Sequence, residues 1–168
     1  MANDDVLSFT PDGITITSDL RIKVESELAC RLPDDLVQAY ISPPALSYPN
    51  QFKFINSNMS GSIAHIVPFI HLPEEYYAFS KTYAIEGLLP FAHDAGRNFI
   101  LIDIAQNSPS FGSIYFYECD FNTPSLITTS MKTFLASIQC FSLDEIDFDE
   151  NGELIMKVDV NNTHNKIE

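Results

Sequence analysis

The residues best suited to chemistry lie near the middle of the chain, where His93 and Asp94 are followed by Arg97. A histidine beside a carboxylate can carry out acid–base catalysis, because histidine titrates close to neutral pH. The chain contains no phosphate-binding loop, GxGxxG motif or serine elbow that would support a reaction there. Asp94 and Gly96 also suit a tight turn before a strand, and we favour this interpretation. We therefore expect no catalytic residues and no enzymatic activity.

A second candidate is an acidic segment near the C-terminus, Asp147-x-Asp149-x-Asn151-Gly152, which matches the first half of a calcium-binding loop. The twelfth position of that loop needs a bidentate carboxylate, but here it is Val158. Asn-Gly between apolar runs is instead the strongest signal for a two-residue β-hairpin turn. We expect a hairpin at this segment and no bound metal.

The other metal-binding residue types are too scattered to form a site. The four histidines and three cysteines show neither zinc-ligand spacing nor a disulfide framework. We therefore expect no cofactor. The first six residues, MANDDV, lack the basic and apolar regions of a secretion signal, so we expect a cytoplasmic protein.

Charge narrows the range of partners. The chain carries 9 basic and 23 acidic residues, a net charge of −14. It lacks the Lys and Arg needed to bind nucleic acid or an anionic membrane, whereas a basic protein would be attracted to it. The densest acidic stretch is residues 141–160, with seven acids and one base.

Periodic apolar residues predict four helices. Ser18 can cap the first, in which Leu20, Val24 and Leu28 recur at every fourth position. A second helix begins at residues 33–35 and ends before Pro43. The others are expected over residues 72–82 and, capped by residue 129 or 130, up to about residue 138.

Strands dominate the remainder of the chain. The pattern predicts a hairpin of residues 6–9 and 14–17, a strand at 52–55, and a central strand at 63–70. It also predicts adjacent antiparallel strands at 99–104 and 113–117, and loops at 42–50 and 89–98. The remaining strands are expected at 126–128 and, as a pair, within 146–160. The expected fold is α+β, a single domain over residues 1–168 with a mixed or antiparallel central sheet flanked by helices.

Four stretches also occur in an order that resembles one known family. They are Leu32-Pro33-Asp34-Asp35-Leu36, Leu89-Pro90-Phe91-Ala92-His93-Asp94-Ala95-Gly96-Arg97-Asn98 running into Phe99-Ile100-Leu101-Ile102-Asp103, Gly112-Ser113-Ile114-Tyr115-Phe116-Tyr117, and Ser130-Met131-Lys132-Thr133-Phe134-Leu135. Together they resemble the SUKH superfamily of Smi/Knr-like proteins over residues 18–140. The chain departs from the pattern at Ser42-Pro43-Pro44-Ala45, where the family has Asn-Gly-Gly, and residues 141–168 form an acidic extension outside it.

The resemblance implies a mixed sheet packed with helices and no catalytic residues. Bacterial members of the superfamily are mostly immunity proteins that bind toxins, so it implies a cytoplasmic protein that neutralises a toxin domain, with a nuclease as one such toxin. The alternative is a regulatory scaffold like the fungal members, and an enzyme using His93 and Asp94 is third. The motif residues are expected to be mainly structural: Leu32, Pro33, Asp34, Pro90, Phe91, Asp94, Gly96, Asn98, Asp103, Gly112, Tyr115, Ser130, Phe134 and Leu135.

Partner recognition is then expected from exposed acids outside the motif, because specificity must come from parts that can differ between relatives. The first choice is the acidic extension, and the second is the segment after the strand at 113–117. The residues are Asp144, Glu145, Asp147, Asp149 and Glu150 in the extension, and Glu118 and Asp120 after the strand.

Overall fold

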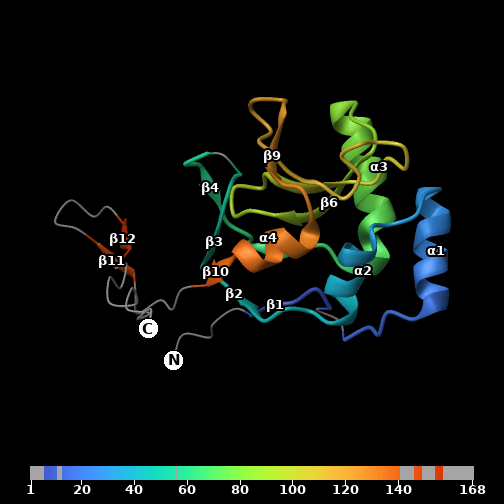
Figure 1. Ribbon diagram of the computed structural model, residues 1–168, viewed down its shortest axis with the longest axis horizontal. Coiled ribbons are helices and arrows are strands. Elements are labelled where there is room, and N and C mark those ends of the chain that lie inside the picture. Colours follow the sequence, from blue (N-terminus) through green and yellow to red (C-terminus); the bar gives the residue numbers. More distant parts are fainter. Residues whose placement is uncertain (1–5, 11–12, 56, 141–145, 149–153, 157–168) are drawn as a thin grey trace, which may run out of the picture.

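The computed structural model describes residues 6–10, 13–55, 57–140, 146–148 and 154–156. Within these ranges the fold is α+β, with four α-helices around a five-stranded antiparallel sheet of order β5-β6-β7-β8-β9 (Figure 1). The helices are α1 (Ser18–Leu28), α2 (Asp34–Ile41), α3 (Leu72–Tyr83) and α4 (Met131–Ser137). The strands of the sheet are β5 (His65–Ile66), β6 (Leu88–His93), β7 (Phe99–Asp103), β8 (Ile114–Tyr117) and β9 (Pro124–Thr128).

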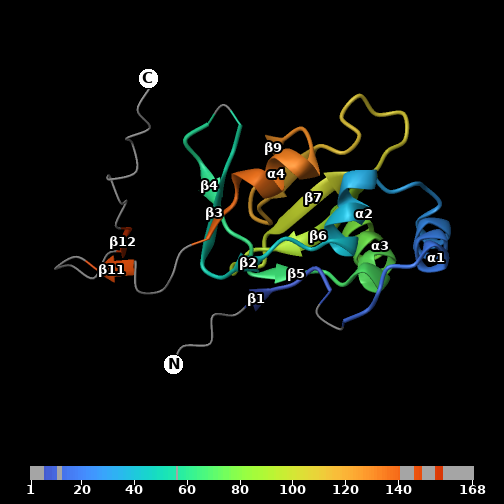
Figure 2. The ribbon, with the colours of Figure 1, turned by 60° about the horizontal axis from the view of Figure 1, so that its bottom comes forward.

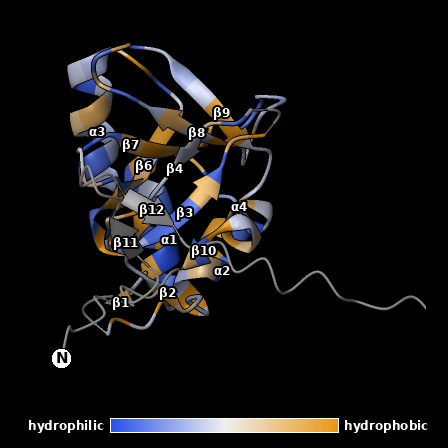
Figure 3. Ribbon diagram, turned by 90° about the vertical axis from the view of Figure 1, so that its left-hand side faces the viewer, coloured by the Kyte–Doolittle hydropathy of each residue, from blue (hydrophilic) through white to orange (hydrophobic). Residues whose placement is uncertain are grey.

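Strands β7 and β8 are adjacent and antiparallel, which confirms the prediction for this pair. Ile100 lies opposite Phe116, and Leu101 lies opposite Tyr115. Figure 3 shows apolar stretches in the strands β6, β7 and β9. Such an apolar sheet must be shielded from water on both faces, and other elements of the fold pack against each face.

The two faces of the sheet bury different side chains because neighbouring residues of a strand point in opposite directions. Ile100 and Phe116 belong to the main core. Leu101 and Tyr117 form a second cluster with Phe79 from α3. Figure 2 shows α3 and α4 on different sides of the sheet.

A smaller sheet of order β10-β3-β4 packs beside the main one. Its strands are β3 (Asn50–Lys53), β4 (Ser60–Gly61) and β10 (Gln139–Cys140). The Phe52 ring lies 5.0 Å from the ring of Phe134 on α4, and the Phe54 ring lies 5.6 Å from that of Phe116 on β8. Both contacts are edge-on, the arrangement that aromatic rings prefer.

Local chemistry sets the ends of the helices. Thr17 caps α1 by accepting a hydrogen bond from the Leu20 amide, so the cap lies one residue before the predicted Ser18. Ser130 caps α4, as predicted, by accepting one from the Thr133 amide. Asp35 on α2 adds a second cap, because its Oδ2 lies 3.0 Å from the Met131 amide nitrogen of α4.

The predicted N-terminal hairpin is wrong. Strand β1 (Val6–Leu7) pairs with β2 (Leu46–Ser47), not with residues 14–17, which form no strand. Phe9 is buried with its ring 5.0 Å from that of Tyr40 on α2. Burial of this aromatic pair outweighs the local turn signal. The predicted loop at residues 42–50 is wrong as well where it contains β2.

The predicted central strand at residues 63–70 is also wrong. Only His65–Ile66 forms a strand, β5, and it lies at an edge of the sheet. Pro68 cannot donate a ladder hydrogen bond, and the chain turns after it into a short 3₁₀ helix, η1 (Phe69–His71).

The predicted loop at residues 89–98 is wrong over residues 89–93, which belong to strand β6, and β6 pairs with both β5 and β7. Pro90 is accommodated because the register shifts between Pro90 and Ala92, forming a bulge. In the tail, β11 (Ile146–Phe148) pairs antiparallel with β12 (Leu154–Met156), which confirms the two strands. The turn predicted at Asn151-Gly152 lies outside the described residues.

Asn50 provides a test of how the smaller sheet is held. Its buried side chain donates to the Ser47 and Ile63 carbonyls and accepts from the Ile63 amide at 2.8 Å. We expect Asn50→Ala to lower the free energy of unfolding by about 2–4 kcal/mol, because it leaves buried backbone groups unpaired. Urea denaturation measures this, with Gln51→Ala as control, since Gln51 makes an exposed bond to Ser60. Equal losses in the two variants would contradict the prediction.

Candidate functional site

Asp94 builds the turn between β6 and β7. Its carboxylate accepts hydrogen bonds from the Asn98 amide at 2.8 Å and from Asn98 Nδ2 at 2.9 Å. The Asp94 amide donates to the Asn98 carbonyl, and Arg97 takes a left-handed conformation with φ 65°. Both carboxylate oxygens are therefore used by the turn.

His93 faces a different neighbour. Its Nε2 lies 3.8 Å from Oε2 of Glu75 on α3, and its ring packs against those of Phe99 and His65. Burial lowers the pKa of His93 below its ordinary value, while the Glu75 carboxylate acts in the opposite direction. His93 and Asp94 thus engage separate partners, although they are adjacent in the sequence.

The other motif residues mainly hold elements together. Asp103 is buried, and its carboxylate accepts hydrogen bonds from the Ala105 amide and the Ser108 hydroxyl. Asp34 pairs with Arg21 of α1 at 2.8 Å, and Gly112 adopts φ 83°, a conformation that favours glycine. Besides Asp103 and Gly112, the buried motif residues are Leu32, Pro33, Pro90, Phe91 and Phe134, whereas Tyr115 and Leu135 pack at the margins of the two clusters.

The acids predicted in the C-terminal extension are not placed. Asp144, Glu145, Asp149 and Glu150 lie outside the described residues, and only the backbone of Asp147 is described, in β11. Glu118 and Asp120, by contrast, occupy the turn that follows β8. Asp120 is exposed and Glu118 is half-buried.

This turn is fixed at several points. The Phe121 amide donates to the Glu118 carbonyl at 3.1 Å, and the Tyr117 hydroxyl donates to Asn122 Oδ1 at 2.9 Å. The Cys119 amide donates to Asn98 Oδ1 at 3.3 Å, which ties the turn to the Asp94 motif.

Cys119 also joins the turn to α3. Its Sγ lies 3.3 Å from the Tyr83 hydroxyl, and this hydrogen bond, with burial, raises the pKa of Tyr83 to about 12. Tyr83 is therefore a neutral phenol at physiological pH. The turn is thus held from the β6–β7 connection and from a helix.

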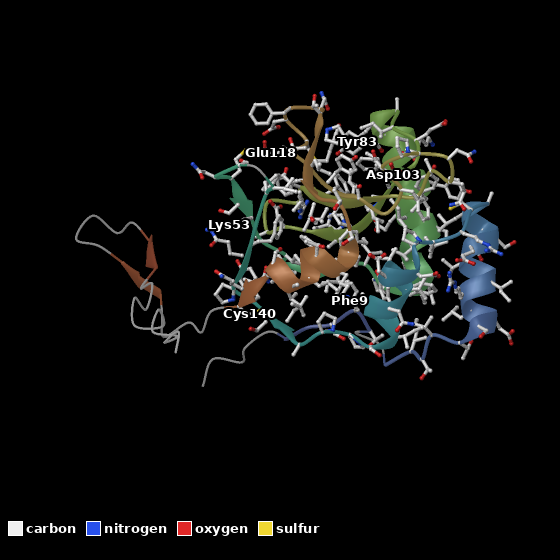
Figure 4. The ribbon with its side chains drawn as sticks, in the orientation of Figure 1. Phe9, Lys53, Tyr83, Asp103, Glu118 and Cys140 are labelled. Atoms are coloured by element: carbon white, nitrogen blue, oxygen red, sulfur yellow. The ribbon has the colours of Figure 1, made fainter. Side chains whose placement is uncertain are left out.

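An open groove of about 360 Å³ lies beside this turn. Phe121 and Met59 stand at its rim with 73% and 53% of their surfaces exposed. Figure 4 labels Glu118 near the connection between β8 and β9, and Lys53 on β3. The lining residues are Met59, Phe116, Glu118, Phe121, Thr123 and Ser125.

Glu118 is among the residues predicted from the sequence for partner recognition, whereas Phe121 and Met59 are not. The available signal was a lone phenylalanine in a polar turn, Glu-Cys-Asp-Phe-Asn, where a buried aromatic is not expected. Met59 carried no such signal, because its position beside the groove depends on how β4 packs.

Metal sites and membrane-spanning helices are two further possibilities in the described part of the chain. No group of three His, Cys, Asp or Glu side chains there could hold a metal ion. No helix in the same ranges is long and apolar enough to cross a membrane.

The fold and this surface define an acidic α+β protein with an apolar groove beside a rigid, acidic turn. Residues 15–137 match the model of the SMI1 / KNR4 family (SUKH-1), so the chain belongs to this family. The match includes all four motif stretches and the groove. The comparison with curated proteins gives no match.

His93 predicts how stability depends on pH. Because its pKa is lowered in the folded state, the unfolded chain takes up a proton near pH 6.5 that the folded chain resists. The folded chain therefore keeps its full free energy of unfolding above pH 6.5, and part of it is lost as the pH falls below 6.5 and His93 is protonated in the unfolded chain. Between pH 7.5 and 5.5 we expect the free energy of unfolding to fall less in His93→Gln than in wild type.

Denaturation midpoints measured across that pH interval give the comparison. His71→Gln is the matched control, because the His71 side chain is exposed. A pH dependence of His93→Gln equal to that of wild type would show that burial of His93 does not contribute.

Proposed function

We propose that this chain is an immunity protein that binds and neutralises a toxin domain with a basic surface. Membership of the SUKH-1 family supports a binding role of this kind. The observation that carries the choice of partner is the net charge of −14. In this proposal the chain acts in the cytoplasm. It neutralises the toxin by covering part of the toxin's surface.

A nuclease is the toxin class that fits this charge best. Nucleases bind the phosphate backbone through Lys and Arg, so their substrate-binding surface is basic. An acidic protein can cover such a surface and compete with nucleic acid. Complementary charge also raises the association rate, which matters for an inhibitor that must act before damage occurs.

The acids that steer the partner are proposed to lie in two places. The first is the extension with Asp144, Asp147 and Asp149. The second is the turn with Glu118 and Asp120, where hydrogen bonds hold the backbone in place. A fixed turn presents its charges at a defined position and loses little entropy on binding.

The proposal requires a secreted toxin encoded beside this chain. Co-expression of its C-terminal domain with and without this chain tests the function, scored by survival and by co-purification of the two proteins. We expect survival only with this chain, and a complex that withstands gel filtration. Toxicity that persists without complex formation would overturn the proposal.

Charge reversal tests the role of the acids. We expect Glu118→Lys/Asp120→Lys and Asp144→Lys/Asp147→Lys/Asp149→Lys to slow association with the toxin about tenfold at low salt and to flatten its salt dependence. Thermal melting of the turn variant should barely change, because exposed charges contribute little to stability.

Stopped-flow association rates at increasing ionic strength provide the measurement. Glu27→Lys is the control for a charge reversal elsewhere, since it reverses one exposed acid near the C-terminal end of α1, away from the turn (Figure 1). If every variant, Glu27→Lys included, slows association by the same factor per reversed charge, these acids serve only as solvated surface.

A further inference from the structure

We infer that the groove between β4 and the β8–β9 turn binds an extended segment of the partner, which inserts an apolar side chain flanked by Lys or Arg. The inference rests on the proposed function, which supplies the identity of the partner. It adds the surface that the partner contacts and the chemistry of the bound segment, and neither net charge nor family membership supplies these.

Phe121 is the first observation. It is the most exposed large apolar residue of the described chain, at 73%, and it stands on a turn fixed by hydrogen bonds from Phe121 to Glu118, Tyr117 to Asn122 and Cys119 to Asn98. An aromatic side chain on a preorganised backbone loses little entropy when it is covered. Residues of this kind contribute most of the energy at protein interfaces.

The floor and opposite wall of the groove are also apolar. Phe116 forms part of the lining and is only 8% exposed, with its ring against that of Phe54. The Met59 carbonyl accepts a hydrogen bond from the Phe54 amide at 3.0 Å, which fixes the backbone of the wall. The Met59 side chain itself is flexible and can adapt to different apolar groups.

The edge of the main sheet favours an extended segment as the occupant. Among the described residues, β9 has a strand neighbour on one side only, β8. The Ile55 amide donates to the Ile127 carbonyl at 2.7 Å, which closes one end of the outer edge. Ser125, further along β9, lines the groove. An added strand could pair there and place alternate side chains in the groove.

Charge determines the residues that flank the apolar side chain. Glu118 lines the groove and Asp120 lies two residues away, whereas the described lining contains no Lys or Arg. The groove between α2 and α4 differs, because its lining contains one base, Lys132, and one acid, Asp35, whose carboxylate already accepts hydrogen bonds from the first amides of α4. Of these two grooves in the described part of the chain, the one beside Phe121 combines an exposed aromatic residue with acidic side chains and no base in its lining.

The test uses a seven-residue peptide in which lysine alternates with valine and one central tryptophan. In an extended peptide the lysines lie on one face and the apolar side chains on the other. This chain has no tryptophan, so the emission reports only the peptide. We expect a saturable blue shift with the wild-type protein, and no shift with a peptide that has glutamate in place of lysine.

Variants then locate the binding site. We expect Phe121→Ser and Met59→Ser each to weaken peptide binding about tenfold or more. Ile22→Ser is the matched control, since Ile22 on α1 is 64% exposed and lies away from the groove (Figure 1). Glu118→Gln/Asp120→Asn should weaken binding less at high salt than at low salt.

Two results would overturn the inference: no saturable shift with the wild-type protein, or equal affinity for Phe121→Ser and Ile22→Ser. Neither result bears on survival in the co-expression test, so failure of the groove is distinguishable from failure of the immunity function. Equal dissociation rates of the toxin from Phe121→Ser and from wild type would overturn the inference as well, because the immunity function would then use another surface.

Discussion

Aromatic packing between the main and the smaller sheet holds the other elements in position. Phe52 and Phe54 on or beside β3 contact Phe134 of α4 and Phe116 of β8, and Phe91 of β6 also lies against Phe134. All five rings are buried, and each buried aromatic contributes a large apolar area as well as edge-on contacts. These contacts bring the smaller sheet to the main one and place Met59 across from β8.

The family motif determines the position of the candidate surface without forming it. Asp94 holds Asn98 in the β6–β7 turn, and Asn98 then accepts a hydrogen bond from Cys119 in the next connection. The side chains that the second turn displays, Asp120 and Phe121, make no contribution to this network. The scaffold can therefore stay constant while the displayed residues change, as specificity requires.

Charge and the groove have different physical roles in the proposed recognition. Exposed acids act over about 10 Å at 0.1 M salt, and they mainly accelerate encounter. An apolar groove acts only on contact, and it mainly slows dissociation. The turn after β8 brings both together, because Glu118 lies in the groove lining and Phe121 at its rim.

Elements whose signals are local could be predicted from the sequence alone. The Pro33 helix start, the Ser130 cap and the paired strands β7 and β8 follow from residues close together in the chain. Family membership and the acidic character of the protein could also be predicted, because motifs and charge are read without coordinates.

Tertiary packing sets the pairing of β1 with β2, the position of β6 and the groove. For β1 and β6, burial of apolar residues outweighed a local turn or loop signal, and a bulge in β6 accommodates Pro90. Met59 and Phe121 line the same groove, although strands β5 to β8 lie between them in the sequence. No local pattern encodes that proximity, because it results from how two sheets pack.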